Sequence, residues 1–392
     1  MRVLHTSDWH VGRMFHGRDL LADQEAVLGG LADLVADERV DVVVVSGDLY
    51  DRAVPSGEAV SACTRILKTI RAAGAQLVVT PGNHDSAPRL GAFGEFTAAG
   101  GLHLRTRVAE LDRPVLLEDR HGPVALYGIP YLEPEPARQA LGAPDARGHA
   151  GVLTEAMRRV RADLAVRSEG TRSVVLAHAF VTGGAACASE RTIAVGGIEQ
   201  VPAAAFDGVD YVALGHLHGP QRIADHLRYS GSPLAYSFSE ARQHKSVLLV
   251  ELDAAGLAGV ERRELPVPRR LGTLTGTLDA LLTDPAHERF TEWFLSLELT
   301  DPVRPTEALR RLQERFPHAV HLEWLPEGGC AGGALRYAQV TRGRTDLEVF
   351  CCFVEDCRGD SPNNRERALL SDALAAAEAM EPGADKPARE AA

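Results

Sequence analysis

Five short polar motifs carry side chains that could bind metal ions, and each motif follows an apolar run. In chain order they are SDWHVGR, SGDLYD, GNHD, the histidine after SVVLA, and GHLHG. Their candidate ligands are Asp8, His10, Asp48, Asn83, His178, His216 and His218. Carboxylate, amide and imidazole groups without a cysteine suit Mn²⁺, Fe or Zn²⁺. The sequence therefore predicts a metal centre.

The number of candidate ligands favours two ions over one. Two divalent ions about 4 Å apart can position a nucleophile and clamp the oxygens of a phosphoryl group during in-line attack. Each motif alone has a plainer interpretation. An Asp after a strand is often a cap, GD and GNHD often form turns, and His178 alone could be a hydrogen-bonded core residue. The recurrence of the motifs in order, each after an apolar run, favours the metal centre.

The candidate ligands must be positioned by strands, because the apolar runs are short and rich in β-branched residues. The predicted strands span 3–6, 40–47, 75–80, 124–129, 173–178, 209–215 and 246–252. Helical patterns at 20–38 and 56–74 lie between them, and Gly74 is a suitable end for the second helix. Apolar strands that alternate with helices predict an α/β fold with a sheet covered on both faces. The motifs then lie at the carboxyl ends of strands, where such sheets bind ligands.

The net charge of −12 by itself argues against a protein that binds nucleic acid, because such domains tend to be basic. Bound cations would neutralise part of this charge if the carboxylates hold metal ions. The remainder would require local basic patches or a partner that supplies contacts to the nucleic acid.

The chain of 392 residues is long enough for one large domain and a smaller one. It begins MRVLHTSDWH, which lacks a signal-peptide core, and apolar runs such as VVVV at 42–45 are too short to span a bilayer. We therefore expect a cytoplasmic protein without a membrane partner. Cys351, Cys352 and Cys357 cluster without paired CxxC spacing, so reduced thiols are favoured over a zinc site.

A basic, Pro-rich stretch at 266–272, PVPRRLG, marks a domain boundary. The predicted divisions are a metal-binding domain at 1–268, a smaller α/β domain at 269–342, an amphipathic helical tail at 343–380, and a disordered end at 381–392. In the smaller domain, FLSLELT and HLEWLP are predicted strands, and PTEALRRLQERFP between them is a predicted helix.

The ordered motifs resemble those of the calcineurin-like metallophosphoesterase superfamily. Within it, residues 1–340 resemble the SbcD branch, bacterial nuclease subunits akin to the Mre-type repair nucleases. The stretches that carry the resemblance are SDWHVGR at 7–13, GNHDSAPRL at 82–90, GGIEQVP at 196–202, GHLHGPQ at 215–221, YSGSPLAYSFSE at 229–240, and LGTLTGTLDALL at 271–282. The resemblance implies a β-sandwich flanked by helices, with a smaller α/β capping domain and a helical tail that binds a partner.

The resemblance also implies a role for each site residue. One ion would be held by Asp8, His10, Asp48 and His218, and the other by Asp48, Asn83, His178 and His216. Asp48 would therefore bridge the two ions. His84 would face the substrate phosphate and stabilise the transition state or protonate the leaving group. Asp51 and Asp85 would orient the ligands.

The activity that the resemblance implies is manganese-dependent cleavage of DNA phosphodiesters. It comprises exonuclease action on duplex ends and endonuclease action on single strands or hairpins, in DNA repair, recombination and replication. The implied partner is an SbcC-type ABC ATPase with a coiled coil, which fits a chain that has no GxxxxGK[ST] loop of its own. The implied assembly is a homodimer within a heterotetramer. The tail is expected either to dock on the coiled coil or to pack against the capping domain.

Arg13 and Arg89 flank the ligand motifs and could hold backbone phosphates, although ordinary surface ion pairs would explain them equally well. Two rival functions stay open. A small-molecule or protein phosphoesterase is disfavoured because the protein-phosphatase branch would read GNHE where this chain reads GNHD, and Ala53 replaces its usual glycine. A non-catalytic DNA-end scaffold is disfavoured by the complete ligand set.

Overall fold

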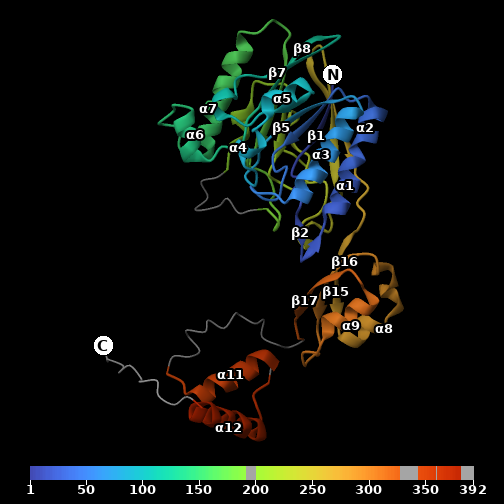
Figure 1. Cartoon of the computed structure of the whole chain (residues 1–392), viewed down its shortest axis with the longest axis vertical. Coiled ribbons are helices and arrows are strands. Elements are labelled where there is room, and N and C mark those ends of the chain that lie inside the picture. Colours follow the sequence, from blue (N-terminus) through green and yellow to red (C-terminus); the bar gives the residue numbers. More distant parts are fainter. Residues whose placement is uncertain (191–199, 327–342, 359, 381–392) are drawn as a thin grey trace. The chain divides into compact units, whose positions relative to one another are not determined.

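The computed structural model describes residues 1–190, 200–326, 343–358 and 360–380 (Figure 1). Most of the GGIEQVP motif and the end predicted to be disordered lie outside these residues. The chain divides into two compact units, Met1–Leu271 and Gly272–Ala392. The finer predicted division into a capping domain and a tail stays a prediction.

Unit 1 is built on two six-stranded sheets. In spatial order, the first sheet contains β14 (Gly256–Glu264), β13 (Ser246–Asp253), β1 (Arg2–Thr6), β4 (Val42–Ser46), β5 (Gln76–Thr80) and β6 (Leu102–Leu104). The second contains β11 (Gln221–Arg222), β12 (Leu227–Tyr229), β10 (Tyr211–Gly215), β9 (Arg172–His178), β8 (Gly122–Gly128) and β7 (Val115–Asp119). A separate hairpin joins β2 (Met14–Phe15) to β3 (Arg18–Asp19).

The strands that lead into the polar motifs are parallel. In the first sheet β1, β4, β5 and β6 run the same way. In the second sheet β8, β9, β10 and β12 do so. Antiparallel strands lie outside them, namely β13, β14, β7 and β11. Because parallel strands end at a common edge, the motifs after β1, β4 and β5 are brought to one side of the first sheet, and those after β9 and β10 to one side of the second.

The central strands of each sheet are buried on both faces. Val42 and Val44 point into the core between the sheets, where they pack in one cluster with Val174 and Leu176 of the second sheet. Val43 and Val45 point the other way, into a second cluster beneath the helices. This two-sided burial explains why the strands are apolar at every position instead of alternating. The predicted helix-flanked β-sandwich is confirmed.

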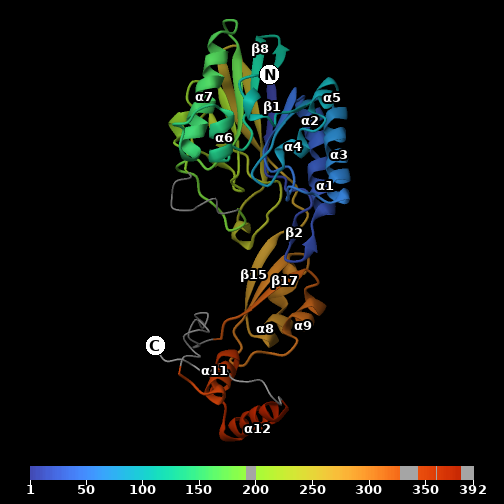
Figure 2. The same ribbon diagram turned by 60° about the vertical axis from the view of Figure 1, so that its left-hand side comes forward.

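Helices cover the outer face of each sheet (Figures 1 and 2). On the first sheet lie α1 (Leu21–Gly29), α2 (Leu31–Glu38) and α3 (Gly57–Ala72), and on the second α6 (Pro134–Ala140) and α7 (Gly148–Ala165). The shorter helical elements of unit 1 are α4 (Ala87–Leu90), α5 (Gly94–Ala99), η1 (Val108–Glu110), η2 (Ala203–Phe206) and η3 (Phe238–Glu240).

The two predicted helices differ in outcome. The helix predicted at 56–74 is confirmed: the side chain of Ser56 accepts a hydrogen bond from the backbone N–H of Ala59 at its start, and Gly74 adopts a φ of 113° just after its end. The single helix predicted at 20–38 is instead two helices. They meet at Gly29 and Gly30, where adjacent glycines weaken helix propensity.

Unit 2 has a three-stranded sheet of β15 (Leu271–Gly276), β16 (Phe294–Leu299) and β17 (Ala319–Trp324). Helices α8 (Leu278–Thr283) and α9 (Ala308–Arg315) share an apolar core with it, and η4 (Pro285–Phe290) follows α8. The strands and the helix predicted between 294 and 326 are confirmed. Helix α11 (Asp346–Arg358) packs against α12 (Asn364–Met380). The free cysteines among the described residues include Cys351 and Cys352.

Candidate metal centre

The predicted ligand side chains come together at the carboxyl ends of five strands. Asp8 and His10 follow β1, Asp48 follows β4, and Asn83 follows β5. The second sheet supplies the remaining ligands, because His178 is the last residue of β9 and the GHLHG motif with His216 and His218 follows β10. All these side chains are almost fully buried, except that of Asn83, which is half-buried.

The backbone of the motifs is held in an uncommon conformation. Asp8, His10, Asp48 and His216 have φ angles of 54°, 46°, 52° and 103°. Residues other than glycine rarely adopt positive φ, and such conformations cluster at functional sites. The left-handed backbone turns each motif away sharply at the end of its strand.

Two glycines allow the loops to approach one another. A Cβ atom on Gly82 would lie 2.2 Å from Oδ1 of Asp48. A Cβ atom on Gly215 would lie 1.8 Å from the carbonyl oxygen of Ser46. Both separations are far below a van der Waals contact, so only glycine fits where these loops cross.

Three overlapping groups of side chains could each hold a cation. They are Asp8, His10 and His218; Asp8, Asp48 and His178; and His10, Asp48 and His84. In each group the possible ligand atoms lie within 4.8 Å of one another. Oδ2 of Asp48 is 3.5 Å from Nε2 of His178 and 3.6 Å from Nε2 of His10. Asp48 is therefore central to the cluster.

Ring hydrogen bonds direct a lone pair into the cluster. Nδ1 of His178 lies 3.0 Å from the carbonyl oxygen of Ser46, and since a carbonyl only accepts, Nδ1 carries the proton. Nε2 of His178 then faces Oδ1 of Asn83 at 2.9 Å. Either a second ring proton, which would donate to Asn83, or a bound metal cation would satisfy this contact.

The electrostatics of the cluster also favour a cation. Burial alone would lower the pKa of His178, but the carboxylates of Asp48 and Asp8 raise it to about 9. Burial raises the pKa of Asp8 to about 7. Burial would also raise the pKa of Asp48, but His178 and other histidines hold it well below its usual range. The buried carboxylates thus attract positive charge from the nearest group that can supply it.

Three other imidazoles are kept neutral. Burial lowers the pKa of His216 to about 3, and it lowers the pKa of His10 and of His218 as well. Neutral imidazole is the form that binds metal ions. Nε2 of His10 and Nε2 of His218 are only 3.1 Å apart, so the two rings point at a common position.

His216 and His84 lie at the margins of the cluster. The ring of His216 is edge-on to that of His178 with centroids 5.2 Å apart, and its backbone N–H donates to Asp8 at 2.9 Å. Its side chain belongs to none of the three groups found among the described residues. The backbone N–H of His84 donates to Asp48, and its Nδ1 donates to the carbonyl oxygen of Asp51 at 2.8 Å. Nε2 of His84 therefore bears no proton in the neutral form.

Asp85 connects two of the loops. Its carboxylate accepts hydrogen bonds from the backbone N–H groups of Leu49 and Tyr50 in the β4 loop and of Gly82 in the β5 loop. Burial raises its pKa to about 7. The side chain thus holds the β4 and β5 motifs in register.

The two arginines differ in their surroundings. The guanidinium of Arg13 donates to Oδ1 of Asp51 and to the carbonyl oxygen of Ser189, both at 3.1 Å, and lies 5.0 Å from the ring centroid of Tyr236. These contacts hold it within the protein. Arg89 is exposed on α4. DNA binding by either residue stays a prediction.

Sequence reasoning missed the residues that surround His218. Ser189, Glu190 and Glu240 contact its ring or backbone, and Lys245 is paired with Glu240. The sequence feature that could have indicated Glu240 was the stretch SFSE, which ends at this residue. SFSE lies within a stretch that resembles the SbcD branch, but the resemblance assigned it no role.

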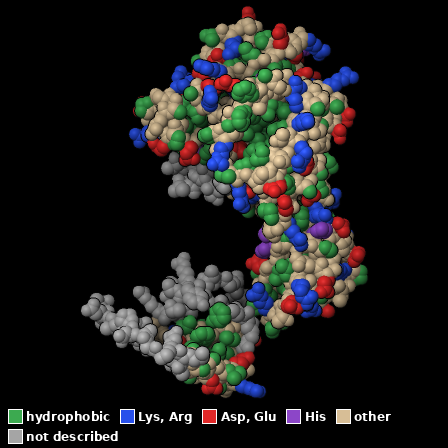
Figure 3. Space-filling view, in the orientation of Figure 1, with side chains coloured by type: hydrophobic (Ala, Val, Ile, Leu, Met, Phe, Trp, Pro, Cys, Tyr) green, Lys and Arg blue, Asp and Glu red, His purple; other side chains and the backbone are tan. Residues whose placement is uncertain are grey.

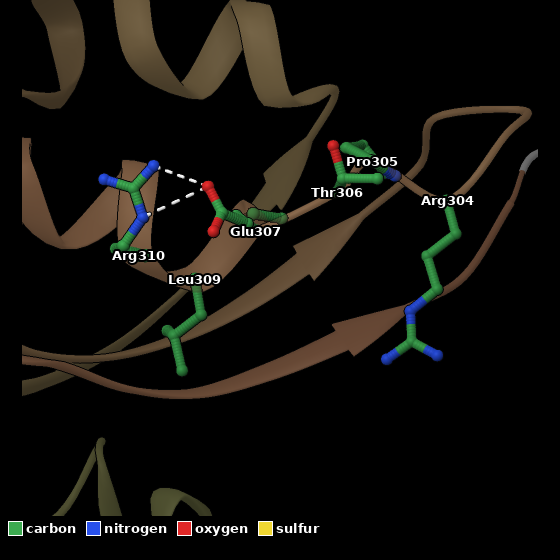
Figure 4. A pocket seen from close by; sticks show the side chains of 7 residues that line it. Arg304, Pro305, Thr306, Glu307, Leu309 and Arg310 are labelled. Carbon is green, nitrogen blue, oxygen red and sulfur yellow. Dashed lines mark hydrogen bonds and ion pairs between the residues drawn. The ribbon is translucent and has the colours of Figure 1, made fainter.

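Unit 2 contains a hollow before α9, lined by residues 304–310 (Figure 4). Glu307 and Arg310 form an ion pair there, with a closest approach of 2.6 Å. The hollow contains none of the three ligand groups found in the described part of the chain. The candidate site is therefore the cluster in unit 1.

The sequence model of the family described as calcineurin-like phosphoesterase matches residues 1–220. The chain belongs to this family. Membership implies a hydrolase that acts on phosphoesters, and with the Asp and His ligand groups it supports metal-dependent hydrolysis. No described helix of this phosphoesterase is long and apolar enough to cross a membrane.

Two solved structures are similar to the phosphoesterase. A protein of Thermus thermophilus is 15% identical, with a TM-score of 0.38, and the match covers 67% of this chain and 98% of that one. A dimetal phosphatase from Danio rerio is 14% identical, with a TM-score of 0.39, and the match covers 68% of this chain and 99% of that one.

Proposed function

We propose that this phosphoesterase is a two-metal DNA nuclease of the SbcD branch. The observation that carries the proposal is the convergence of the predicted ligand side chains, from five strand ends in two sheets, in one cluster. Three of the five motifs that supply these ligands, SDWHVGR, GNHD and GHLHG, also lie in stretches that resemble the SbcD branch.

In the proposed site, Asp8, His10, Asp48 and His218 hold one ion, and Asp48, Asn83, His178 and His216 hold the other. The bridging role of Asp48 is supported by the position of its Oδ2, which lies 3.5 Å from Nε2 of His178 and 3.6 Å from Nε2 of His10, proposed ligands of different ions. When bound, the ions supply charge that stabilises the phosphoryl oxygens and orients the attacking water. The amide oxygen of Asn83 is neutral, which limits the negative charge that an approaching phosphodiester meets.

His84 is the proposed catalytic residue that touches the substrate. Its Nδ1 is committed to the carbonyl oxygen of Asp51, so only Nε2 can act on a phosphate. A protonated Nε2 would donate to a phosphoryl oxygen or to the leaving oxygen. Asp85 is proposed to orient the loop that carries His84, since it binds backbone N–H groups on both sides.

DNA binding must overcome the net charge of −12. On the face shown in Figure 3, basic and acidic side chains are interspersed over unit 1. We therefore propose that an SbcC-type ABC ATPase supplies much of the positive charge and the ATP dependence. The exposed apolar side chains of Phe350, Phe353 and Leu369 on α11 and α12 support docking of this helical pair on a coiled coil.

The decisive experiment compares substrates in the presence of Mn²⁺, with and without the SbcC-type partner. End-labelled duplex DNA, hairpin DNA, a chromogenic phosphodiester and a chromogenic phosphomonoester are each incubated with the purified full-length chain. We expect cleavage of both DNA substrates and of the diester. Vigorous monoester hydrolysis without DNA cleavage in any combination would identify a small-molecule phosphoesterase instead. Stoichiometric metal binding without hydrolysis of any substrate would point to a scaffold.

A further inference from the structure

A buried ion pair lies behind the candidate metal centre. The side chains of Glu240 and Lys245 are 0% and 1% exposed and bind each other closely. Nζ of Lys245 also donates to the carbonyl oxygen of His218 and to Oγ of Ser232, both at 3.0 Å. Desolvation of two charges offsets most of their attraction, so a buried pair need not contribute to stability. Its placement against His218 suggests a positional role.

The second oxygen of the Glu240 carboxylate faces the metal centre. Oε1 of Glu240 accepts hydrogen bonds from the backbone N–H of Tyr236 and from the hydroxyl of Ser189. Oγ of Ser189 also lies 2.8 Å from Nδ1 of His218. Oε1 of Glu240 itself lies 3.5 Å from Nδ1 of His218, so the Ser189 hydroxyl is the nearer of two oxygens that face this nitrogen.

The direction of these hydrogen bonds follows from the donors available. A carboxylate paired with a lysine has no proton to give, so Ser189 donates its proton to Glu240. The oxygen of Ser189 must then accept from Nδ1 of His218. With the proton on Nδ1, the lone pair of His218 lies on Nε2, which points toward Nε2 of His10.

We propose that Ser189 and Glu240 are positioning residues that fix the tautomer and orientation of His218, and that Lys245 holds the Glu240 carboxylate in place. The inference rests on the proposed function, in which His218 holds one of two ions. Metal-binding histidines commonly donate their second ring N–H to such a partner, and removal of the partner lowers metal affinity by about 10- to 100-fold.

Two further contacts hold the serine in place. The carboxylate of Glu190 accepts from the backbone N–H of His218 at 2.6 Å. The guanidinium of Arg13 donates to the carbonyl oxygen of Ser189 at 3.1 Å. The segment that carries Ser189 is thus attached to both His218 and the β1 motif, so its hydroxyl is presented to the ring in a defined geometry.

Ser189→Ala tests the inference with little risk to folding, because Ser189 is only half-buried and the ion pair stays intact. Ser189→Thr retains the hydroxyl and is the conservative variant. Ser168→Ala is the matched control, since the exposed hydroxyl of Ser168 contacts Thr171 before the start of β9. In all variants the full-length, metal-free protein is titrated with Mn²⁺ by calorimetry.

We expect Ser189→Ala to bind one of two Mn²⁺ ions about 10-fold more weakly or worse, and Ser189→Thr and Ser168→Ala to bind both normally. In parallel, long-range ¹H–¹⁵N NMR on histidine-labelled, metal-free protein reports the tautomer of His218, with signals assigned from a His218→Gln variant. The expected result is a proton on Nδ1 in the wild type and a mixture of tautomers in Ser189→Ala. Unchanged affinity and an unchanged tautomer in Ser189→Ala would overturn the inference.

A double variant tests the role of the ion pair between Glu240 and Lys245. Glu240→Ala combined with Lys245→Met removes both charges, so neither is left buried without a partner. We expect the same weakening of one ion as in Ser189→Ala, and wild-type affinity in a folded double variant would overturn the role of the pair. Failure of the wild type to bind Mn²⁺ would instead refute the proposed function, and the tautomer measurement on metal-free protein would still decide the inference.

Discussion

Replacement of Asp48 by asparagine is the sharpest perturbation of the proposed centre. The substitution preserves side-chain size and an oxygen that can accept from the backbone N–H of His84, but it removes one charge. Because Oδ2 of Asp48 lies within 3.6 Å of both His10 and His178, proposed ligands of different ions, we expect the loss of both ions, not of one. Without metal, the substitution also removes repulsion between Asp48 and the carboxylates of Asp8 and Asp85, which offsets the lost attraction to His178.

The size of the effect follows from ligand linkage. A ligand at 100 times its Kd stabilises the folded state by about 2.7 kcal/mol per site, so two sites contribute about 5 kcal/mol. For a unit of this size, each kcal/mol corresponds to about 2 °C in Tm. Saturating Mn²⁺ should therefore raise the Tm of the wild type by about 10 °C, and that of Asp48→Asn by about 2 °C or less.

The assay is a thermal melt with and without Mn²⁺, together with metal content after equilibrium dialysis. Asp279→Asn, which changes an exposed carboxylate on α8, is the control and should behave as the wild type. The metal-free Tm of Asp48→Asn should stay within a few degrees of the wild-type value, which separates metal loss from misfolding. Two tightly bound ions in Asp48→Asn would refute the bridging role.

Three further measurements test the site. His84→Gln should retain both ions but lose about 10²- to 10⁴-fold in kcat on a phosphodiester. The control His244→Gln changes an exposed ring and should have the kcat of the wild type. Loss of metal from His84→Gln would show that His84 is a ligand. Because the carboxylates raise the pKa of His178 to about 9, this ring is protonated below that pH, and its proton competes with the cation. Mn²⁺ affinity should therefore increase with pH up to about 9, and binding below that pH should release a proton. Calorimetry in buffers of different ionisation enthalpy measures this release, and its absence would contradict the prediction. Gly82→Ala places a Cβ atom 2.2 Å from Asp48 and should lower the free energy of unfolding by at least about 2 kcal/mol. The control Gly29→Ala, with open space around it, should be neutral or slightly stabilising. Equal stabilities of the two variants in denaturant titrations would contradict the close approach of the loops.

The strands that position the centre could be predicted because they are buried on both faces. A run such as VVVV at 42–45 admits no alternation, and a polar motif at its end is conspicuous. The edge strand β14 was missed because GLAGVERRE is largely exposed and charged, so it forms a strand through its pairing with β13 and not through its own periodicity. The division of strands between two sheets is likewise a tertiary property that apolar runs do not encode.

The contacts around the ligands could not be predicted from the sequence, for a different reason. Ser189 and Glu240 are 51 residues apart, and nothing in either local sequence indicates that they meet at His218. Residue type alone also cannot separate a histidine that binds an ion from one that faces a substrate. His84 lies as close to Asp48 and His10 as a ligand would, so experiments must assign its role.

The centre joins two sheets, and this has a consequence for how the protein becomes active during synthesis. The backbone N–H of His216 binds Asp8 across 208 residues of sequence, and the ring of His178 binds Ser46 across 132. A fragment that ends before β10 lacks His216 and His218, and so lacks a ligand of each proposed ion. Phosphoester hydrolysis therefore requires the ribosome to have released more than half of the chain and the two sheets to have docked, so we expect a nascent chain that stalls before β10 to be inactive.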